Sequence, residues 1–273
     1  MKIKSNIDNA TDFNEIVSKK YGTLNIVHSD LYIISDFDNT ITTGESYGSL
    51  NVITKSNLLG EDYQKEYIDI VNKYENRAKY IEKDSKLIEK LWEKHISKYL
   101  KMLEKYNLNR ELLESIIENS NITFRKGFKE FIGFLHDKKI PLIILSSGLG
   151  NSIEIFLNNN NCYYDNIYVV SNFIEFNKEG YISKVPETVI TPVNKNKVIF
   201  DDKLKEILKV RKYKVIFGDI KDDSGMTQIN KEDKSLSVAF LNDLDLENEL
   251  ELAFDIVDKN NNVLDWIENI LQG

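Results

Sequence analysis

Two aspartates separated by a single residue follow the first strongly apolar run of the chain. Asp36 and Asp38 come directly after Leu31–Ile34, and Thr40 follows two residues later. The apolar run predicts a buried strand, and ligands of open α/β sheets collect at the carboxyl ends of strands. Alternate residues of an extended segment share a face, so both carboxylates can point toward one place. They would repel each other without a cation, and oxygen ligands favour a hard ion such as Mg²⁺.

Polar residues suited to phosphoryl transfer recur further along the chain. Ser146 follows the apolar run at 141–145 and precedes two glycines, Lys195 lies in a polar segment, and Asp219 and Asp223 follow another apolar run. Phosphoryl transfer needs an in-line nucleophile, neutralisation of the phosphate oxygens and a proton for the leaving oxygen. The last two aspartates offer further oxygen ligands or support for them, and a turn or helix cap is the simpler interpretation.

Each of the other polar residues has a chemical role to fill. Asp36 can be the nucleophile that forms an aspartyl phosphate, and Asp38 can protonate the leaving alkoxide and then activate water. The hydroxyl of Ser146 and nearby backbone N–H groups can hold phosphate oxygens at a helix N-terminus, and Lys195 offers them a cation. Taken singly, a serine before glycine is often only a helix cap and a lysine is usually a solvated surface charge.

Composition limits the classes of protein that the chain can belong to. Its 273 residues are 41% hydrophobic and 11% aromatic, which is enough for one large domain or for a core domain with an insertion. The net charge of -8 and the lack of a long basic run argue against a nucleic-acid polymer as partner. A small anionic substrate fits, because a local positive site can exist within an acidic protein.

Cysteine content and hydropathy bear on the compartment. Cys162 is the only cysteine, which excludes an internal disulfide framework and a cysteine zinc cluster and predicts a buried structural thiol. No apolar run reaches membrane-spanning length, and the first residues lack a leader pattern. We therefore expect a cytoplasmic protein with no membrane partner, and the oligomeric state is left open.

Periodicity predicts an α/β fold with a helical insertion. From Arg125 onward, helical patterns alternate with short β-rich runs, which indicates a parallel sheet. Residues 44–123 show helical spacing, so the predicted domains are a core of 1–43 and 124–273 and a helical cap of 44–123. Thr42–Asn57, where the cap begins, is expected to be a loop or hinge. The expected strands span 31–34, 141–145, 167–170, 214–217, 237–241 and 254–257. The expected helices include 8–20, one capped by Asn109, 128–135 and 262–271, and 174–184 is expected to form a hairpin.

The order and spacing of these motifs resemble those of the haloacid dehalogenase (HAD) superfamily of phosphatases. The resemblance is to its four motifs, which correspond here to Asp36-x-Asp38-x-Thr40, Ser146, Lys195 and Asp219-x-x-x-Asp223. Within the superfamily, the chain is most similar to the cytosolic pyrimidine 5'-nucleotidase (cytosolic 5'-nucleotidase III) family. The stretches that carry this likeness are Ser146–Gly150, Val169–Phe173, Asn194–Lys195 and Phe240–Asp243, and Arg125–Phe128 resembles the return from a cap.

The resemblance implies a three-layer Rossmann-like core with a parallel sheet and an inserted helical cap. It also implies a nucleophile at Asp36 and an acid/base at Asp38. Mg²⁺ would be held by the Asp36 carboxylate, the Asp38 backbone carbonyl and Asp219. Asp223 would lie behind them and steady Lys195.

The resemblance further implies a set of substrate contacts. Ser146, the backbone of Ser147, Lys195 and Thr40 of the first motif would bind phosphate. The family uses a cap glutamate to contact the base, and Glu89, six residues before His95, is the matching candidate. Glu93 lies on the same helical face and could take that role instead, and a solvated helix charge is the simpler interpretation of either residue.

Three departures leave the base preference open. Gly218–Asp223 replaces the usual Gly-Asp-Ser-x-Gly-Asp, Ser147 stands where close relatives carry alanine, and the loop at 42–59 does not match in detail. We expect a Mg²⁺-dependent phosphomonoesterase that hydrolyses nucleoside 5'-monophosphates, with pyrimidine nucleotides favoured. The alternatives are a HAD phosphatase for phosphoserine or a sugar phosphate, and a catalytically silent nucleotide- or phosphate-binding protein. The last fits less well, because every catalytic position holds a competent residue type.

Overall fold

A six-stranded parallel sheet forms the centre of the molecule. The computed structural model describes residues 10–22, 26–80 and 85–272. The strand order is β3-β2-β1-β6-β7-β8, and every neighbouring pair is parallel. The strands are β1 (Leu31–Ser35), β2 (Leu142–Leu149), β3 (Ile167–Asn172), β6 (Tyr213–Gly218), β7 (Lys234–Phe240) and β8 (Ile256–Asp258). The predicted α/β class is confirmed.

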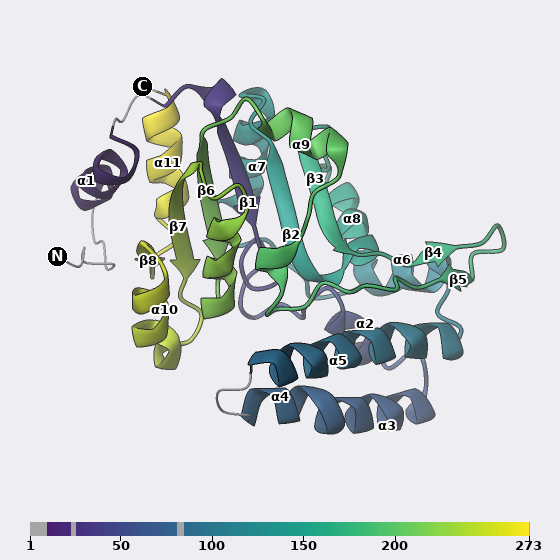
Figure 1. The fold of residues 1–273 in the computed structure, drawn as a ribbon. Coiled ribbons are helices and arrows are strands. Elements are labelled where there is room, and N and C mark those ends of the chain that lie inside the picture. The colour runs from purple at the N-terminus through teal and green to yellow at the C-terminus, as the bar shows by residue number, and fades with distance from the viewer. Residues whose placement is uncertain (1–9, 23–25, 81–84, 273) are drawn as a thin grey trace.

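Both faces of the sheet are covered by helices, which makes three layers (Figure 1). Ile33 and Phe217 belong to a core shared with helices on one face, namely α1 (Ala10–Tyr21), α7 (Phe128–Asp137), α8 (Gly150–Asn159) and α11 (Val263–Gln272). Ile34 and Ile216 face the other way, onto α9 (Asp202–Leu208) and η4 (Lys221–Gln228). Because successive strand residues alternate between these cores, the strands need unbroken apolar runs, as the sequence shows.

A helical unit follows β1 in the sequence and lies beyond the carboxyl ends of the strands (Figure 1). We call this unit the cap. It contains α2 (Asn51–Lys55), α3 (Glu61–Ile70), the π-helical η2 (Val71–Glu75), α4 (Asn76–Tyr80), α5 (Ser85–Lys105) and α6 (Arg110–Glu118). Asn109 was predicted to be the N-terminal capping residue of α6. This prediction is confirmed, because the Asn109 side chain accepts a hydrogen bond from Leu112 N at 2.9 Å.

Three buried hydroxyls connect the helices of the cap. The Thr54 Oγ1 lies 2.7 Å from the Tyr99 hydroxyl and 3.0 Å from the Tyr63 hydroxyl, and these two tyrosines are also 3.0 Å apart. Tyr99 donates to the carbonyl of Leu50 at 2.9 Å. Since buried polar groups are costly without partners, this cluster fixes α2 against α3 and α5.

The predicted hairpin is present beside the sheet. Its strands are β4 (Glu175–Phe176) and β5 (Ile182–Lys184), and Gly180 has a φ of 84° in the turn between them. The Gly180 carbonyl accepts a hydrogen bond from Arg110 N at 2.9 Å. The hairpin therefore contacts the start of α6 in the cap.

Several expectations about local structure need correction. Thr42–Asn57 is not wholly a loop, because it contains α2, a five-residue helix whose β-branched residues disguise it and which is held by the buried Tyr99 cluster. Two helices were not predicted, α9 and α10 (Glu247–Ala253), because they are short and therefore show little periodicity. The first helix is present as α1, and Asp8, its expected start, lies outside the described residues.

The remaining short helices are η1 (His28–Asp30), η3 (Lys195–Lys197) and η5 (Leu244–Leu246). Cys162 is buried, as expected. Among the described residues, no helix is both long enough and apolar enough to cross a membrane.

Lys214 of β6 is a fully buried lysine held by backbone carbonyls. Its Nζ donates to Thr227 O at 3.0 Å, to Asn230 O at 2.9 Å and to Ile229 O. These carbonyls lie at the end of η4 and in the turn before β7. The lysine therefore fixes this segment against the sheet.

We predict that Lys214→Met lowers the free energy of unfolding by about 3 kcal/mol, because it leaves three backbone carbonyls without their donor. Urea unfolding followed by circular dichroism measures the change. The matched control is Lys212→Met, which removes an exposed lysine two residues away and should stay within about 0.5 kcal/mol of the parent protein. Equal midpoints for the two variants would contradict the structural role of Lys214.

Candidate active site

The carboxyl ends of adjacent strands bring the predicted acidic residues together. Ser35, at the end of β1, is paired in register with Phe217 near the end of β6. Asp36 and Asp219 follow these strand ends directly, and both are buried. Ser146 lies in β2, the neighbour of β1 on its other side. The parallel sheet therefore gathers motifs that are far apart in sequence at one edge.

Lys195 is buried between two carboxylates. Its side chain is 2% exposed, and its Nζ lies 2.7 Å from Asp36 Oδ1 and 2.7 Å from Asp223 Oδ1. The preceding Asn194 fixes the turn, since its side chain accepts from Thr191 N at 2.8 Å and donates to Val189 O at 3.1 Å. Burial alone would lower the pKa of Lys195, but the two carboxylates outweigh it and raise that pKa above its usual value.

The unusual loop after β6 is organised by Asp223. Its second oxygen, Oδ2, accepts from the backbone N–H of Asp219 at 3.2 Å and of Ile220 at 3.4 Å. A Cβ on Gly218 would lie 2.4 Å from Asp223 Cβ, so glycine is required there. Despite its altered sequence, the loop therefore places one carboxylate against Lys195 and another beside Asp36.

Three carboxylates are close enough to share a cation. Oxygens of Asp36, Asp219 and Asp223 lie within 4.8 Å of one another. Burial, reinforced by neighbouring carboxylates, raises the pKa of Asp36 well above its usual value and that of Asp219 to about 7. Lys195 supplies a single positive charge to this buried cluster. The all-oxygen donor set and the excess of buried negative charge fit a divalent cation.

Asp38 is oriented by the loop that leads into the cap. Its carboxylate accepts from Ser49 N at 2.7 Å and from Ser49 Oγ at 2.9 Å. Burial raises the pKa of Asp38, and the hydrogen bonds from Ser49 partly offset this effect. Asp38 and Asp36 therefore have different environments, and the Asp38 carboxylate is bound by a cap-side residue that the sequence analysis did not single out.

The segment from Ser146 to Gly150 packs closely against the same loop. The Oγ of Ser146 accepts from Gly148 N at 3.0 Å, and α8 begins at Gly150. A Cβ on Gly148 would lie 1.9 Å from Ser49 Oγ and 3.0 Å from Asp38 Oδ2. Any larger residue at this position would therefore displace the Ser49 hydroxyl beside Asp38.

Asn172 fixes the backbone at Ser147. Its Nδ2 lies 2.9 Å from the carbonyl of Ser147 and 2.9 Å from that of Ile190. The stretch that contains Asn172 carried part of the family resemblance, but only the structure shows that this amide connects β3 to both segments. The half-buried Ser147 is thereby held beside Ser146.

Thr40 contacts a carboxylate of the acidic cluster. Its buried Oγ1 donates to Asp219 Oδ1 at 3.2 Å, and the phosphate contact expected of this hydroxyl stays a prediction. Arg125 holds the same turn, donating to Thr40 O at 2.8 Å, to Asn39 O at 2.5 Å and to the side chain of Asn242 at 2.7 Å. The return from the cap therefore secures the loop after β1.

The two candidate glutamates of α5 have different surroundings. Glu89 accepts from Lys197 Nζ through both carboxylate oxygens, each at 2.6 Å. Glu93 lines a hollow of about 410 Å³ between α5 and the segment Glu187–Val189. Neither contact was predicted, because both depend on the way that α5 sits against the core.

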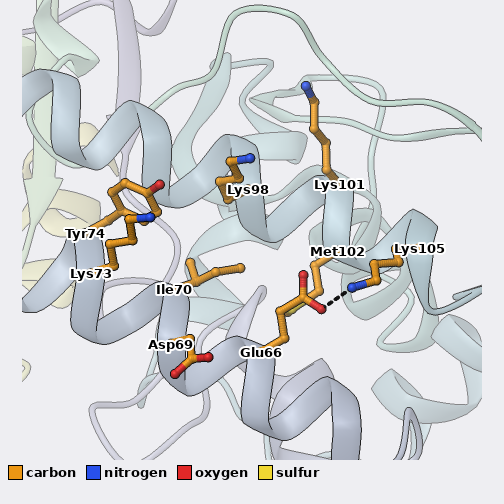
Figure 2. A pocket seen from close by; sticks show the side chains of 9 residues that line it. All are labelled: Glu66, Asp69, Ile70, Lys73, Tyr74, Lys98, Lys101, Met102 and Lys105. Atoms are coloured by element: carbon orange, nitrogen blue, oxygen red, sulfur yellow. Dashed lines mark hydrogen bonds and ion pairs between the residues drawn. The ribbon is translucent and has the colours of Figure 1, made fainter.

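A second hollow lies within the cap, between α3, η2 and α5 (Figure 2). It has a volume of about 310 Å³, and its lining includes an ion pair of 2.5 Å between Lys105 and Glu66. Its other lining residues are Asp69, Ile70, Lys73, Tyr74, Lys98, Lys101 and Met102. This lining lacks the clustered carboxylates of the sheet edge, so the candidate active site is at the ends of β1, β2 and β6.

Comparisons with known proteins identify the family of the chain. Residues 32–273 match the family described as pyrimidine 5'-nucleotidase (UMPH-1). The chain is 27% identical over 259 residues to the 7-methylguanosine phosphate-specific 5'-nucleotidase of Gallus gallus, covering 89% of this chain and 88% of that protein. It is 28% identical over 256 residues to the corresponding nucleotidase A of Xenopus laevis, covering 89% and 87%.

Solved structures show the same fold. The crystal structure of cytosolic 5'-nucleotidase IIIB bound to cytidine superposes with a TM-score of 0.80 at 21% identity, covering 97% of this chain and 94% of that one. The predicted HAD fold is therefore confirmed. The chain belongs to the pyrimidine 5'-nucleotidase (UMPH-1) family of the HAD superfamily, and it is a 5'-nucleotidase, a phosphoric monoester hydrolase that acts on nucleoside monophosphates.

Proposed function

We propose that this nucleotidase hydrolyses pyrimidine nucleoside 5'-monophosphates with Mg²⁺, through a phosphorylated Asp36. The observation that carries the proposal is the buried lysine bridge, in which Lys195 Nζ lies 2.7 Å from both Asp36 and Asp223. The bridge holds one Asp36 oxygen and sets a positive charge beside the position of an incoming phosphate. Positioning and charge neutralisation supply most of the catalysis in phosphoryl transfer.

In the first step, a carboxylate oxygen of Asp36 attacks the phosphorus atom and the P–O bond to the nucleoside breaks. Lys195 and the hydroxyl of Ser146 bind the phosphate oxygens, as do backbone N–H groups of the segment that follows Ser146. The nucleoside oxygen leaves with the proton of Asp38, whose raised pKa favours the protonated form needed here. Ser49 holds Asp38 in place for this transfer.

In the second step, Asp38 removes a proton from a water molecule. The water oxygen attacks the phosphorus atom, the bond to Asp36 breaks, and inorganic phosphate leaves with Asp36 restored. Mg²⁺ held by Asp36 and Asp219, with the backbone carbonyl of Asp38, would neutralise negative charge on the phosphoryl oxygens. Asp223 keeps Lys195 and the Asp219 loop in position.

The base preference is the finer part of the proposal. The family is named for pyrimidine nucleotides, whereas relatives at 27–28% identity are named for 7-methylguanosine phosphate. We assign recognition of the base to the cap, through Glu89 or Glu93 of α5, since α5 faces the core at both residues. A cap that closes over the site would also exclude water from it.

We predict Mg²⁺-dependent phosphate release that is fastest with UMP and CMP and is lost in the presence of a chelator. A panel of nucleoside monophosphates, sugar phosphates and phosphoserine measures this preference.

We also predict that Asp36→Asn lowers kcat by at least about 1000-fold, because its amide cannot serve as the nucleophile. Asp202→Asn, an exposed change at the start of α9, is the control. Unchanged release by Asp36→Asn would refute its role, and faster release from a non-nucleotide would refute the substrate assignment.

We predict that Gly148→Ala lowers kcat by about 100-fold, because the added Cβ displaces Ser49 and with it Asp38. Steady-state kinetics with UMP measure the loss. Gly133→Ala on α7 is the matched control, since a Cβ there meets nothing within 4 Å. If Gly148→Ala retained the kcat of this control, the orientation of Asp38 by Ser49 would not matter for catalysis.

A further inference from the structure

An ion pair between the cap and the core is formed by a lysine that no motif includes. Lys197 Nζ lies 2.6 Å from each carboxylate oxygen of Glu89, and the two residues are 108 positions apart in sequence. The Glu89 side chain is 24% exposed and that of Lys197 is 59% exposed. Glu89 belongs to α5 of the cap, and Lys197 belongs to η3 of the core.

The same turn of η3 serves both the catalytic bridge and the cap. Lys195 begins the turn and extends inward to Asp36 and Asp223. Lys197 ends the turn and extends to Glu89. A single short segment therefore fixes the nucleophile at one end and the candidate base-recognition residue at the other.

The pair changes what Glu89 can recognise. Lys197 donates to both carboxylate oxygens, so an amino group on a base must compete with the lysine when it donates to Glu89. The pair is also neutral overall, which weakens the attraction of Glu89 for a positively charged base such as 7-methylguanine. An ammonium has three hydrogens, so Lys197 keeps one to donate to a carbonyl oxygen of a base.

We propose that Lys197 is a specificity-determining residue, which favours a neutral base with an acceptor at its recognition edge, such as the O4 of uracil. It disfavours the amino group of cytosine and the charged ring of 7-methylguanine. The inference rests on the proposed function, since it requires the base to reach α5. It deepens that function by assigning the choice among bases to a core residue.

The test is the kcat/KM for UMP, CMP and 7-methylguanosine 5'-monophosphate with Mg²⁺, in the parent protein and in Lys197→Met. We expect the parent to prefer UMP. Lys197→Met should lower the UMP/CMP ratio and the UMP/7-methylguanosine monophosphate ratio by about fivefold, mainly through KM. Hydrolysis of p-nitrophenyl phosphate, which has no base, should change by less than about twofold. Lys197→Arg, which keeps the charge, should retain the preference for UMP.

Two further variants separate specificity from structure. Lys203→Met removes an exposed lysine of α9 and should leave both ratios unchanged. Lys197→Met should raise kcat/KM for CMP relative to UMP. Adding Glu89→Gln to this variant should abolish that rise, because the rise requires a carboxylate that no lysine contacts.

If the parent protein hydrolyses UMP and Lys197→Met leaves the UMP/CMP and UMP/7-methylguanosine monophosphate ratios of kcat/KM unchanged, the role of Lys197 is overturned and the proposed function is not. Failure of the parent to release phosphate from any nucleotide would overturn the proposed function, and the inference with it.

Discussion

The buried bridge of Lys195 with Asp36 and Asp223 is the interaction on which the rest of the site depends. A lysine that is 2% exposed needs its counter-charges in place, and removing one partner of a buried pair typically costs about 3–5 kcal/mol. The bridge joins the end of β1, the η3 turn and the start of η4, three segments that are distant in sequence and adjacent in space. Parallel packing of β1 between β2 and β6 supplies the frame that lets these segments meet.

A second dependence connects the core with the cap. Asp38 is held by Ser49. The backbone carbonyl of the next residue, Leu50, accepts a hydrogen bond from the hydroxyl of Tyr99 in α5. Movement of α5 therefore bears on the segment that orients Asp38. Nearer its start, α5 contacts the core through the pair of Glu89 and Lys197. Under the proposed function, acid/base geometry and base recognition are thus both coupled to the position of one helix.

The sequence was informative where chemistry and strand ends coincide. Asp36, Asp219 and Ser146 were identified because each follows an apolar run, and the parallel sheet brings those ends together. The helix α2, the Ser49 contact and the Lys197 partner of Glu89 were not foreseen. Each depends on tertiary contacts between segments distant in sequence, which leave no local periodicity. The hydrogen bond from Thr40 to Asp219 could likewise be seen only in the structure.

The most direct test of the account is to trap the phosphorylated enzyme. The protein is mixed with UMP and Mg²⁺, quenched in acid within the first turnover, digested and examined by mass spectrometry. We predict one phosphoryl group on the peptide that contains Asp36, which disappears on longer incubation as water releases phosphate. A phosphoryl group on another residue, or its absence during active turnover under conditions in which phosphorylated aspartate survives, would contradict Asp36 as the nucleophile.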